Sequence, residues 1–178
     1  MRFSTEYVQT TFRAYADCGA KVYLEGGNIA HKGEPMINPK YFNKYLLPSY
    51  QEVLNAIHDW CGKYILHTDG DITLLLDFII ESGFDGLQCL ELSYVDPTLV
   101  KRKIGDKICF SGNIDTRNNL VDASKKEVEQ AVKNATKALG HGGGFILSPA
   151  NFQPGISVDR LKWMIETAGT HGVYSLAL

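Results

Sequence analysis

The run YILHTDGDITLLLDFIIES (Tyr64–Ser82) decides the fold class of this 178-residue chain. Tyr64–His67 is a short apolar segment that suits a buried strand, and Ile72–Ser82 has the pattern of a helix that ends at Gly83. A buried strand followed at once by a helix is the repeating unit of a parallel sheet. The stretch therefore predicts an α/β fold.

The same strand-then-helix pattern recurs on both sides of this run. The expected strands are Lys21–Glu25, Tyr64–His67, Gly86–Leu92, Lys107–Ser111 and Gly144–Ser148. The expected helices are Tyr41–Trp60, Ile72–Ser82, Pro97–Ile104, Ser124–Leu139 and Val158–Ala168, and a loop spans Gly26–Pro39. Five such units fit either an open doubly wound sheet or part of a (β/α)₈ barrel, since a whole barrel usually needs about 200 residues or more.

The composition of the chain argues against several classes of function. The net charge is −2, which gives no reason to expect nucleic acid or an anionic membrane as a partner. No uncharged apolar run approaches the ~20 residues of a membrane span, and the N-terminal run MRFSTEYVQTTFRAYAD lacks the apolar core of a signal peptide. The four cysteines are widely spaced without a CxxC pair, as in reduced cytoplasmic proteins. We therefore expect a cytoplasmic protein with a single domain over residues 1–178.

Polar residues stand at the end of every expected strand. Ligands bind at the carboxyl ends of parallel strands in open sheets and in barrels, so these residues are the candidates for a site. They are Glu25, His67 with Asp69, Glu91, Asn113 with Asp115, and Ser148 with Asn151. For Asn113 and Asp115 a turn is the simpler interpretation, because both residue types favour turns.

The His67–Asp69 run is the sharpest of these signals. If the strand persists, residues i and i+2 face the same side, so the side chains of His67 and Asp69 converge. Such a pair binds a metal ion, or acts in acid–base chemistry with the carboxylate orienting the imidazole. The structural alternative is that Asp71 caps the next helix and His67 only ends a strand. The sequence also leaves the role of Glu25 open, because a carboxylate at a strand end can be a metal ligand, a base or the partner of a lysine.

Several longer runs resemble the C-terminal part of the uroporphyrinogen decarboxylase superfamily. They are INPKYFNKYLLPSYQEVL (Ile37–Leu54), HTDGDI (His67–Ile72), ESGFDGLQCLE (Glu81–Glu91), IGDKICFSGNID (Ile104–Asp115) and GGGFILSPANFQPG (Gly142–Gly155). The resemblance implies a distorted (β/α)₈ barrel of the TIM type, of which this chain would supply the last five β/α units. A partial barrel in turn implies that the chain needs the missing N-terminal half or self-association.

The resemblance also implies a choice of activities. The HxxG motif after a strand and the GGGFILSP run are similar to the branch that transfers methyl groups to or from a corrinoid, typically with zinc and a corrinoid protein as partner. In that reading Glu25, His67 and Asp69 would be the catalytic and metal-binding residues. The substrate-binding residues would be Glu91, Asn113, Asp115, Ser148 and Asn151. The alternatives are a cofactor-free uroporphyrinogen decarboxylase of porphyrin and heme biosynthesis, or a non-catalytic half-barrel that needs a partner chain.

The proposed metal site departs from the methyltransferase branch in its ligands. Asp69 and, approximately, Asn151 stand where that branch carries cysteines. The remaining ligands would be nitrogen and oxygen atoms, and sites of that type favour harder ions than a thiolate site does. We therefore expect the isolated chain to bind zinc weakly or not at all.

Overall fold

A computed structural model describes residues 2–173 of the chain. Within this range a parallel sheet has the strand order β1 (Val22–Gly26), β4 (Lys63–His67), β5 (Gly86–Gln88), β6 (Cys109–Ile114) and β7 (Phe145–Pro149). The chain divides into two compact units, residues 1–87 and residues 88–178. The α/β class and the parallel sheet expected from the sequence are confirmed.

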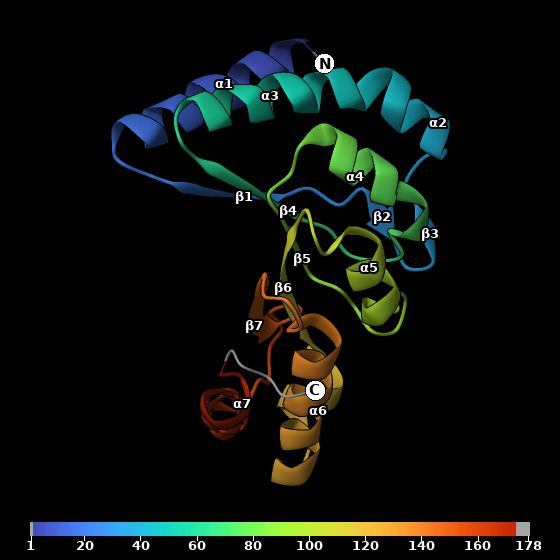
Figure 1. Cartoon of the computed structure of the whole chain (residues 1–178), viewed down its shortest axis with the longest axis vertical. Helices are drawn as coiled ribbons and strands as arrows, with labels where there is room; N and C mark the ends of the chain where they lie inside the picture. Colours follow the sequence, from blue (N-terminus) through green and yellow to red (C-terminus); the bar gives the residue numbers. More distant parts are fainter. Residues whose placement is uncertain (1, 174–178) are drawn as a thin grey trace. The chain divides into compact units, whose positions relative to one another are not determined.

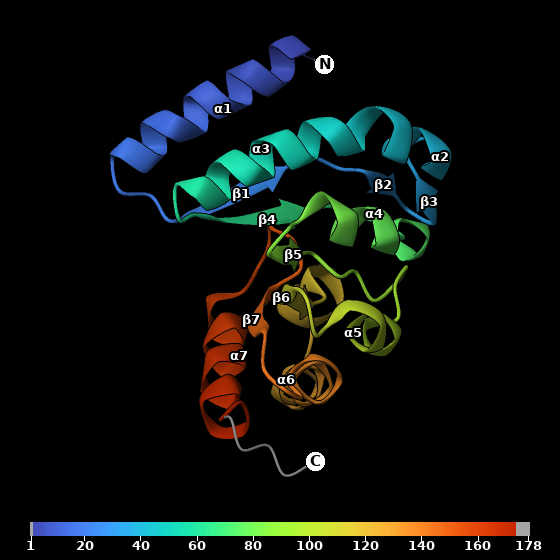
Figure 2. The ribbon, with the colours of Figure 1, turned by 45° about the horizontal axis from the view of Figure 1, so that its top comes forward.

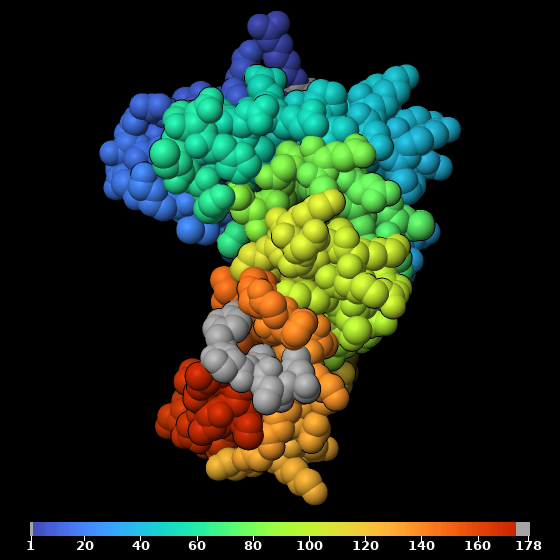
Figure 3. Space-filling model, in the orientation of Figure 1, coloured from blue at the N-terminus to red at the C-terminus, as the bar shows by residue number. Residues whose placement is uncertain are grey.

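The first unit packs two helices against one side of β1 and β4. Besides these strands it contains α1 (Arg2–Asp17), β2 (Ala30–His31), β3 (Glu34–Pro35), α2 (Pro39–Tyr41), η1 (Phe42–Leu46), α3 (Leu47–Asp59), η2 (Thr73–Leu75) and α4 (Leu76–Ser82). Figures 1 and 2 show α1 and α3 on the same side of the two strands. In the space-filling view, atoms of α1 (blue) lie against atoms of α3 (blue-green) (Figure 3).

The two faces of β1 and β4 differ sharply in burial. Tyr23 pairs with Tyr64 across the strands, and these side chains are only 3% and 1% exposed. The ring of Phe12 on α1 lies 5.1 Å from the Tyr23 ring and 5.5 Å from the Tyr64 ring, so this is the helix-covered face. Val22 and Leu24 alternate with the covered residues and are 62% and 55% exposed.

Three features of the first unit were not expected from the sequence. The N-terminal segment forms α1, whose β-branched residues weaken its own helix propensity, so that packing against α3 stabilises it. The expected loop Gly26–Pro39 contains the antiparallel β2–β3 pair. The expected helix Tyr41–Trp60 is divided into α2, the π-helical turn η1 and α3. Pro48 lies in the first turn of α3, where its missing N–H removes a helical hydrogen bond at this division.

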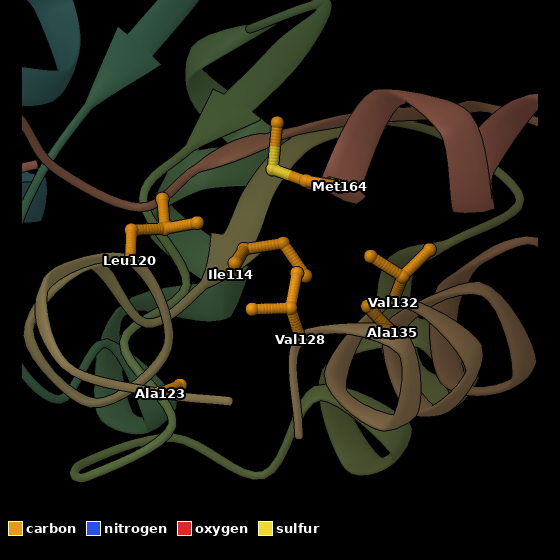
Figure 4. Packing of buried hydrophobic residues seen from close by; sticks show 7 residues of the cluster. All are labelled: Ile114, Leu120, Ala123, Val128, Val132, Ala135 and Met164. Carbon is orange, nitrogen blue, oxygen red and sulfur yellow. The ribbon is translucent and has the colours of Figure 1, made fainter. Parts of the chain in front are cut away.

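The second unit is built around a core between β6 and two helices. Its other elements are α5 (Pro97–Ile104), η3 (Thr116–Val121), α6 (Lys125–Leu139) and α7 (Val158–His171). Figure 4 shows Ile114 of β6, Val132 of α6 and Met164 of α7 among the side chains of this cluster. Full burial of a large apolar side chain such as Ile114, Val128 or Met164 contributes about 1.5–3 kcal/mol to folding, so the cluster stabilises the unit.

In this part of the chain, most element boundaries expected from the sequence lie close to the observed ones, but two strands have different bounds. The helix Pro97–Ile104 agrees with α5, and the capping box between Ser124 and Glu127 begins α6 as expected. The strand expected over Gly86–Leu92 ends at Gln88, because Cys89 adopts a left-handed φ of 73° that breaks the extended backbone. β6 begins and ends later than the expected strand Lys107–Ser111.

Candidate functional site

His67 and Asp69 lie together where β4 ends in the first unit. The Nε2 atom of His67 is 3.7 Å from Oδ1 of Asp69, as the i, i+2 spacing leads one to expect. Asn28 holds the other side of Asp69: its Nδ2 donates to Oδ2 at 3.2 Å, and its Oδ1 accepts from the Asp69 amide at 3.1 Å. One carboxylate oxygen of Asp69 is thus fixed by Asn28 while the other is turned toward the imidazole.

Thr68, the residue between His67 and Asp69, connects the end of β4 to the β2–β3 pair. Thr68 is buried, and its Oγ1 accepts hydrogen bonds from the backbone amides of Ile29 at 3.0 Å and Ala30 at 3.3 Å. Gly70 follows with φ +78°, and a Cβ there would lie 2.8 Å from the backbone of His31, so only glycine fits. The backbone around His67 and Asp69 is therefore rigidly placed.

Asp71 has the structural role that the sequence left open. Its Oδ1 accepts from the Thr73 amide at 2.8 Å, where η2 begins. This contact does not compete with the pairing of His67 and Asp69. The structural interpretation of Asp71 and the convergence of the pair therefore hold together.

Glu25 does not join this pair, and the expected cluster of three residues is wrong in this respect. Glu25 pairs with Leu66 across the strands, whereas Gly26 pairs with His67, so Glu25 and His67 lie on opposite faces. On the helix-covered face, Glu25 Oε2 accepts from the Tyr64 hydroxyl at 2.8 Å and Oε1 from the Tyr50 hydroxyl at 3.3 Å. The alternation of side chains along β1 is the reason for the separation.

The electrostatics of Glu25 reflect this covered position. Burial raises the pKa of the Glu25 carboxyl above its usual value, although the two phenol hydrogen bonds act in the opposite direction. Burial also raises the pKa values of Tyr64 and Tyr50, and the nearby Glu25 charge adds to both shifts. These phenols therefore stay protonated and act as donors to Glu25.

The second unit gathers three other expected residues around one cavity. Glu91, Asp115 and Asn151 follow β5, β6 and β7, and all three line a cavity of about 330 Å³. Asp115 accepts from the Asn118 amide at 2.8 Å and from its side chain at 2.9 Å, which caps η3. The turn expected at Asp115 and a place in the cavity wall therefore coexist.

Asn113 and Ser148 have different surroundings. Asn113 is 2% exposed with φ 79°, and its Nδ2 donates to the Leu90 carbonyl at 2.9 Å. It borders a separate cavity of about 700 Å³ beside α5 and α6. The Ser148 hydroxyl lies 3.4 Å from that of Ser111 and donates to the Pro149 carbonyl at 3.1 Å. The 330 Å³ cavity is lined by neither residue.

Sequence reasoning missed two residues of the 330 Å³ cavity that carry chemical function. Arg117 lies at the beginning of η3 and is one of the residues that line the cavity. Tyr94 lies in the turn after β5 and brings a phenol. Tyr94 comes after Glu91 and Arg117 comes after Asp115, so each residue lies beyond the strand-end position of its own loop. The π-helical turn η3, which the sequence did not predict, places Arg117 at this cavity.

No described helix has both the length and the apolar composition needed to cross a membrane. The family model for uroporphyrinogen decarboxylase (URO-D) matches residues 1–171. No curated protein matches the sequence.

Solved structures resemble this chain in fold. A methyltransferase from Methanosarcina mazei is 20% identical with a TM-score of 0.77, and the match covers 95% of this chain and 48% of that one. A D-psicose 3-epimerase from Clostridium cellulolyticum H10, solved with D-tagatose, is 10% identical with a TM-score of 0.58 over 95% of this chain and 69% of that one. This chain thus spans about half the length of the methyltransferase.

Proposed function

Because this chain belongs to the uroporphyrinogen decarboxylase (URO-D) family, we propose that it takes part in corrinoid-linked methyl transfer. The observation that carries the proposal is the His67–Asp69 pair, which Asn28 fixes at the end of β4. The structural likeness to a methyltransferase supports the same branch of the family. The five parallel strands would form part of a TIM-type barrel, with the carboxyl ends of the strands as the reactive face.

In this proposal His67 and Asp69 handle the proton or the metal ion at the reacting atom. A corrinoid on a partner protein would supply the methyl group or receive it. The imidazole nitrogen and the carboxylate oxygen are both ligand types of zinc, and Asn28 orients the carboxylate as an outer hydrogen-bond partner does in metal sites. The pair therefore fits two positions of a metal site with nitrogen and oxygen ligands, in which we expect zinc to be held weakly.

The 330 Å³ cavity of the second unit is the proposed substrate pocket. Glu91, Asp115 and Asn151 would accept or donate hydrogen bonds to the substrate. Arg117 would bind a substrate carboxylate, because its guanidinium offers paired donors to planar anions. Asn113 and Ser148 would support the strand ends without bordering this cavity.

The chain is proposed to act together with further protein. The exposed Val22 and Leu24 of β1 leave one apolar strand face uncovered in the first unit. An N-terminal half of the barrel or a second copy of the chain would cover such a face. A corrinoid protein would be an additional partner.

Uroporphyrinogen decarboxylation is the second candidate function, and the description of the matching family model favours it. It requires no cofactor. Arg117 would then hold an acetate or propionate carboxylate of the substrate in the 330 Å³ cavity. A non-catalytic half-barrel that only assembles with a partner chain is the third candidate.

Spectroscopy of a corrinoid separates these functions. The full chain is mixed with methylcobalamin and a thiol, without oxygen, and demethylation is followed by the visible absorbance of the corrinoid. With an N-terminal half supplied, or once the chain has self-associated, we expect turnover in the wild type and at least a tenfold lower rate in His67→Ala, since a positioned acid–base group typically contributes 10²–10⁴-fold. His141→Ala, an exposed histidine in the second unit, is the matched control and should keep the wild-type rate.

The outcomes point to different candidates. Release of carbon dioxide from uroporphyrinogen, with no change in the corrinoid spectrum, would favour the decarboxylase. Inactivity in both assays, together with stable association with another chain, would favour the non-catalytic half-barrel. Equal rates in His67→Ala and His141→Ala would remove His67 from the reaction.

A further inference from the structure

The first unit contains a second cavity, on the helix-covered face of β1 and β4. Its volume is about 240 Å³. The residues that line it come from α1, β1, η1, α3 and β4, and are Ser4, Thr5, Val8, Glu25, Leu46, Ser49, Tyr50, Val53 and Tyr64. Because Glu25 and His67 lie on opposite faces of the strands, this cavity is distinct from the pair that carries the proposed function.

Glu25 is the charged residue of this lining, and the side chains that donate hydrogen bonds to it are neutral phenols. Each carboxylate oxygen accepts one phenol hydrogen bond, from Tyr50 or from Tyr64. Among the described residues, no ion pair involves Glu25. A carboxylate oxygen has two lone pairs, so each still has room for one more donor. A largely buried carboxylate with neutral partners favours a cation beside it, because burial without a counter-charge is costly.

The walls of the cavity suit a particular kind of cation. Val8, Leu46 and Val53 give it an apolar side, while the rings of Tyr50 and Tyr64 stand near the carboxylate and attract positive charge. One water molecule occupies about 30 Å³ in the liquid, and the volume of the cavity is several times larger. The cavity is therefore larger than a bare metal ion needs. Ser4 is exposed, so the cavity has a side that faces solvent.

We infer that this cavity, the Glu25 pocket, binds a small alkylammonium ion. The ammonium group donates to the free lone pairs of Glu25, and the alkyl chain lies against Val8, Leu46 and Val53. The hydroxyl groups of Thr5 and Ser49 are further polar contacts for the ammonium. The inference does not depend on methyl transfer, since the residues concerned are separate from His67 and Asp69.

Titration of the full chain with n-butylammonium chloride tests this inference. Binding is measured by calorimetry and by amide chemical shifts of the first unit, with 1-butanol as the uncharged analogue and potassium chloride as the inorganic cation. We expect butylammonium to bind, and 1-butanol and potassium to bind at least tenfold more weakly. Glu25→Gln keeps an acceptor for the tyrosines and removes the charge, so it should lower the butylammonium affinity at least about tenfold.

Two further variants make the result independent of folding. Glu52→Gln on α3 makes the same charge change at an exposed residue outside the pocket lining and should leave the affinity unchanged. Ser49→Phe keeps the Glu25 charge and fills the pocket, so it should abolish binding. Equal affinity for 1-butanol and butylammonium, equal affinity for potassium, or unchanged binding in a folded Glu25→Gln protein would each overturn the inference.

Discussion

At the scale of single residues, Asp85 of the first unit interacts with three groups at once. Its Oδ1 lies 2.7 Å from Lys63 Nζ, and its Oδ2 lies 2.8 Å from His58 Nε2 and accepts from the Tyr64 amide at 2.9 Å. Burial by itself raises the pKa of Asp85, but the hydrogen bonds from these three groups together outweigh it and lower the pKa below its usual value. Asp85 thereby fastens α3 to β4.

This arrangement predicts a pH-dependent loss of stability in Asp85→Asn. A carboxyl group whose pKa is lower in the folded than in the unfolded chain stabilises the folded state at pH values above its unfolded-state pKa, which is roughly 4. This contribution is lost as the pH falls through the pKa of the folded state. We expect the variant to unfold with about 1–2 kcal/mol less free energy at pH 7, and the difference to shrink toward pH 4 and below. Urea denaturation across this pH range measures it.

The exposed Asp106 provides the control for this prediction. Asp106→Asn makes the same chemical change at an exposed residue and should leave stability within about 0.5 kcal/mol of the wild type. A constant difference between Asp85→Asn and the wild type from pH 7 to pH 3 would contradict the linkage.

At the scale of elements, α6 begins at a capping box that the sequence alone specifies. The Ser124 hydroxyl accepts from the Glu127 amide at 3.4 Å, and the Ser124 amide donates to the Glu127 carboxylate at 2.7 Å. The helix then buries Val128 and Val132 in the core shown in Figure 4. A local hydrogen-bonded cap and a long apolar stripe therefore specify the same element.

The cap predicts a measurable stability change in Ser124→Ala. Removal of an N-cap hydroxyl exposes unsatisfied amides at the start of the helix and costs about 0.5–2 kcal/mol of unfolding free energy. Ser124→Asp should restore most of the loss, because aspartate caps helices as well as serine does. Thermal unfolding of the three proteins measures the order. An alanine variant as stable as the wild type would show that the core alone fixes α6.

At the scale of the whole molecule, both strands at the ends of the sheet order expose apolar residues. Leu24 of β1 is 55% exposed in the first unit, and Ile146 of β7 is 52% exposed in the second. End strands with exposed apolar side chains are templates for pairing with another chain. They are thus the natural places for the partner surface that we propose.

Self-association of the full chain is the corresponding prediction. Light scattering at micromolar concentration should give a mass above that of the monomer, and Leu24→Lys should lower it, because a charge on an edge strand opposes pairing. Lys21→Gln is a control that changes a residue before β1 without adding charge to the exposed face. A wild-type chain that stays monomeric and unfolds cooperatively would contradict the proposed partner surface.

Features of the fold that depend on near neighbours in the chain could be predicted from the amino-acid sequence. The start of α5 follows from Pro97 at its first position and the start of α6 from its capping box, which are both local signals. The approach of His67 to Asp69 follows from their i, i+2 spacing, which is also local. The family resemblance was equally readable, since it rests on runs of residues.

Contacts between residues that are far apart in the chain could not be predicted in this way. The sequence places Glu25 at a strand end, but the pairing of β1 with β4 brings Tyr64 to it and the packing of α3 against these strands brings Tyr50. Packing against α3 also stabilises α1, in which Thr5, Val8, Thr10 and Thr11 are β-branched and lower the helix propensity. Strand alternation defines two faces without specifying which one is covered, because the free energy that selects the covered face comes from burial against residues far away in the chain.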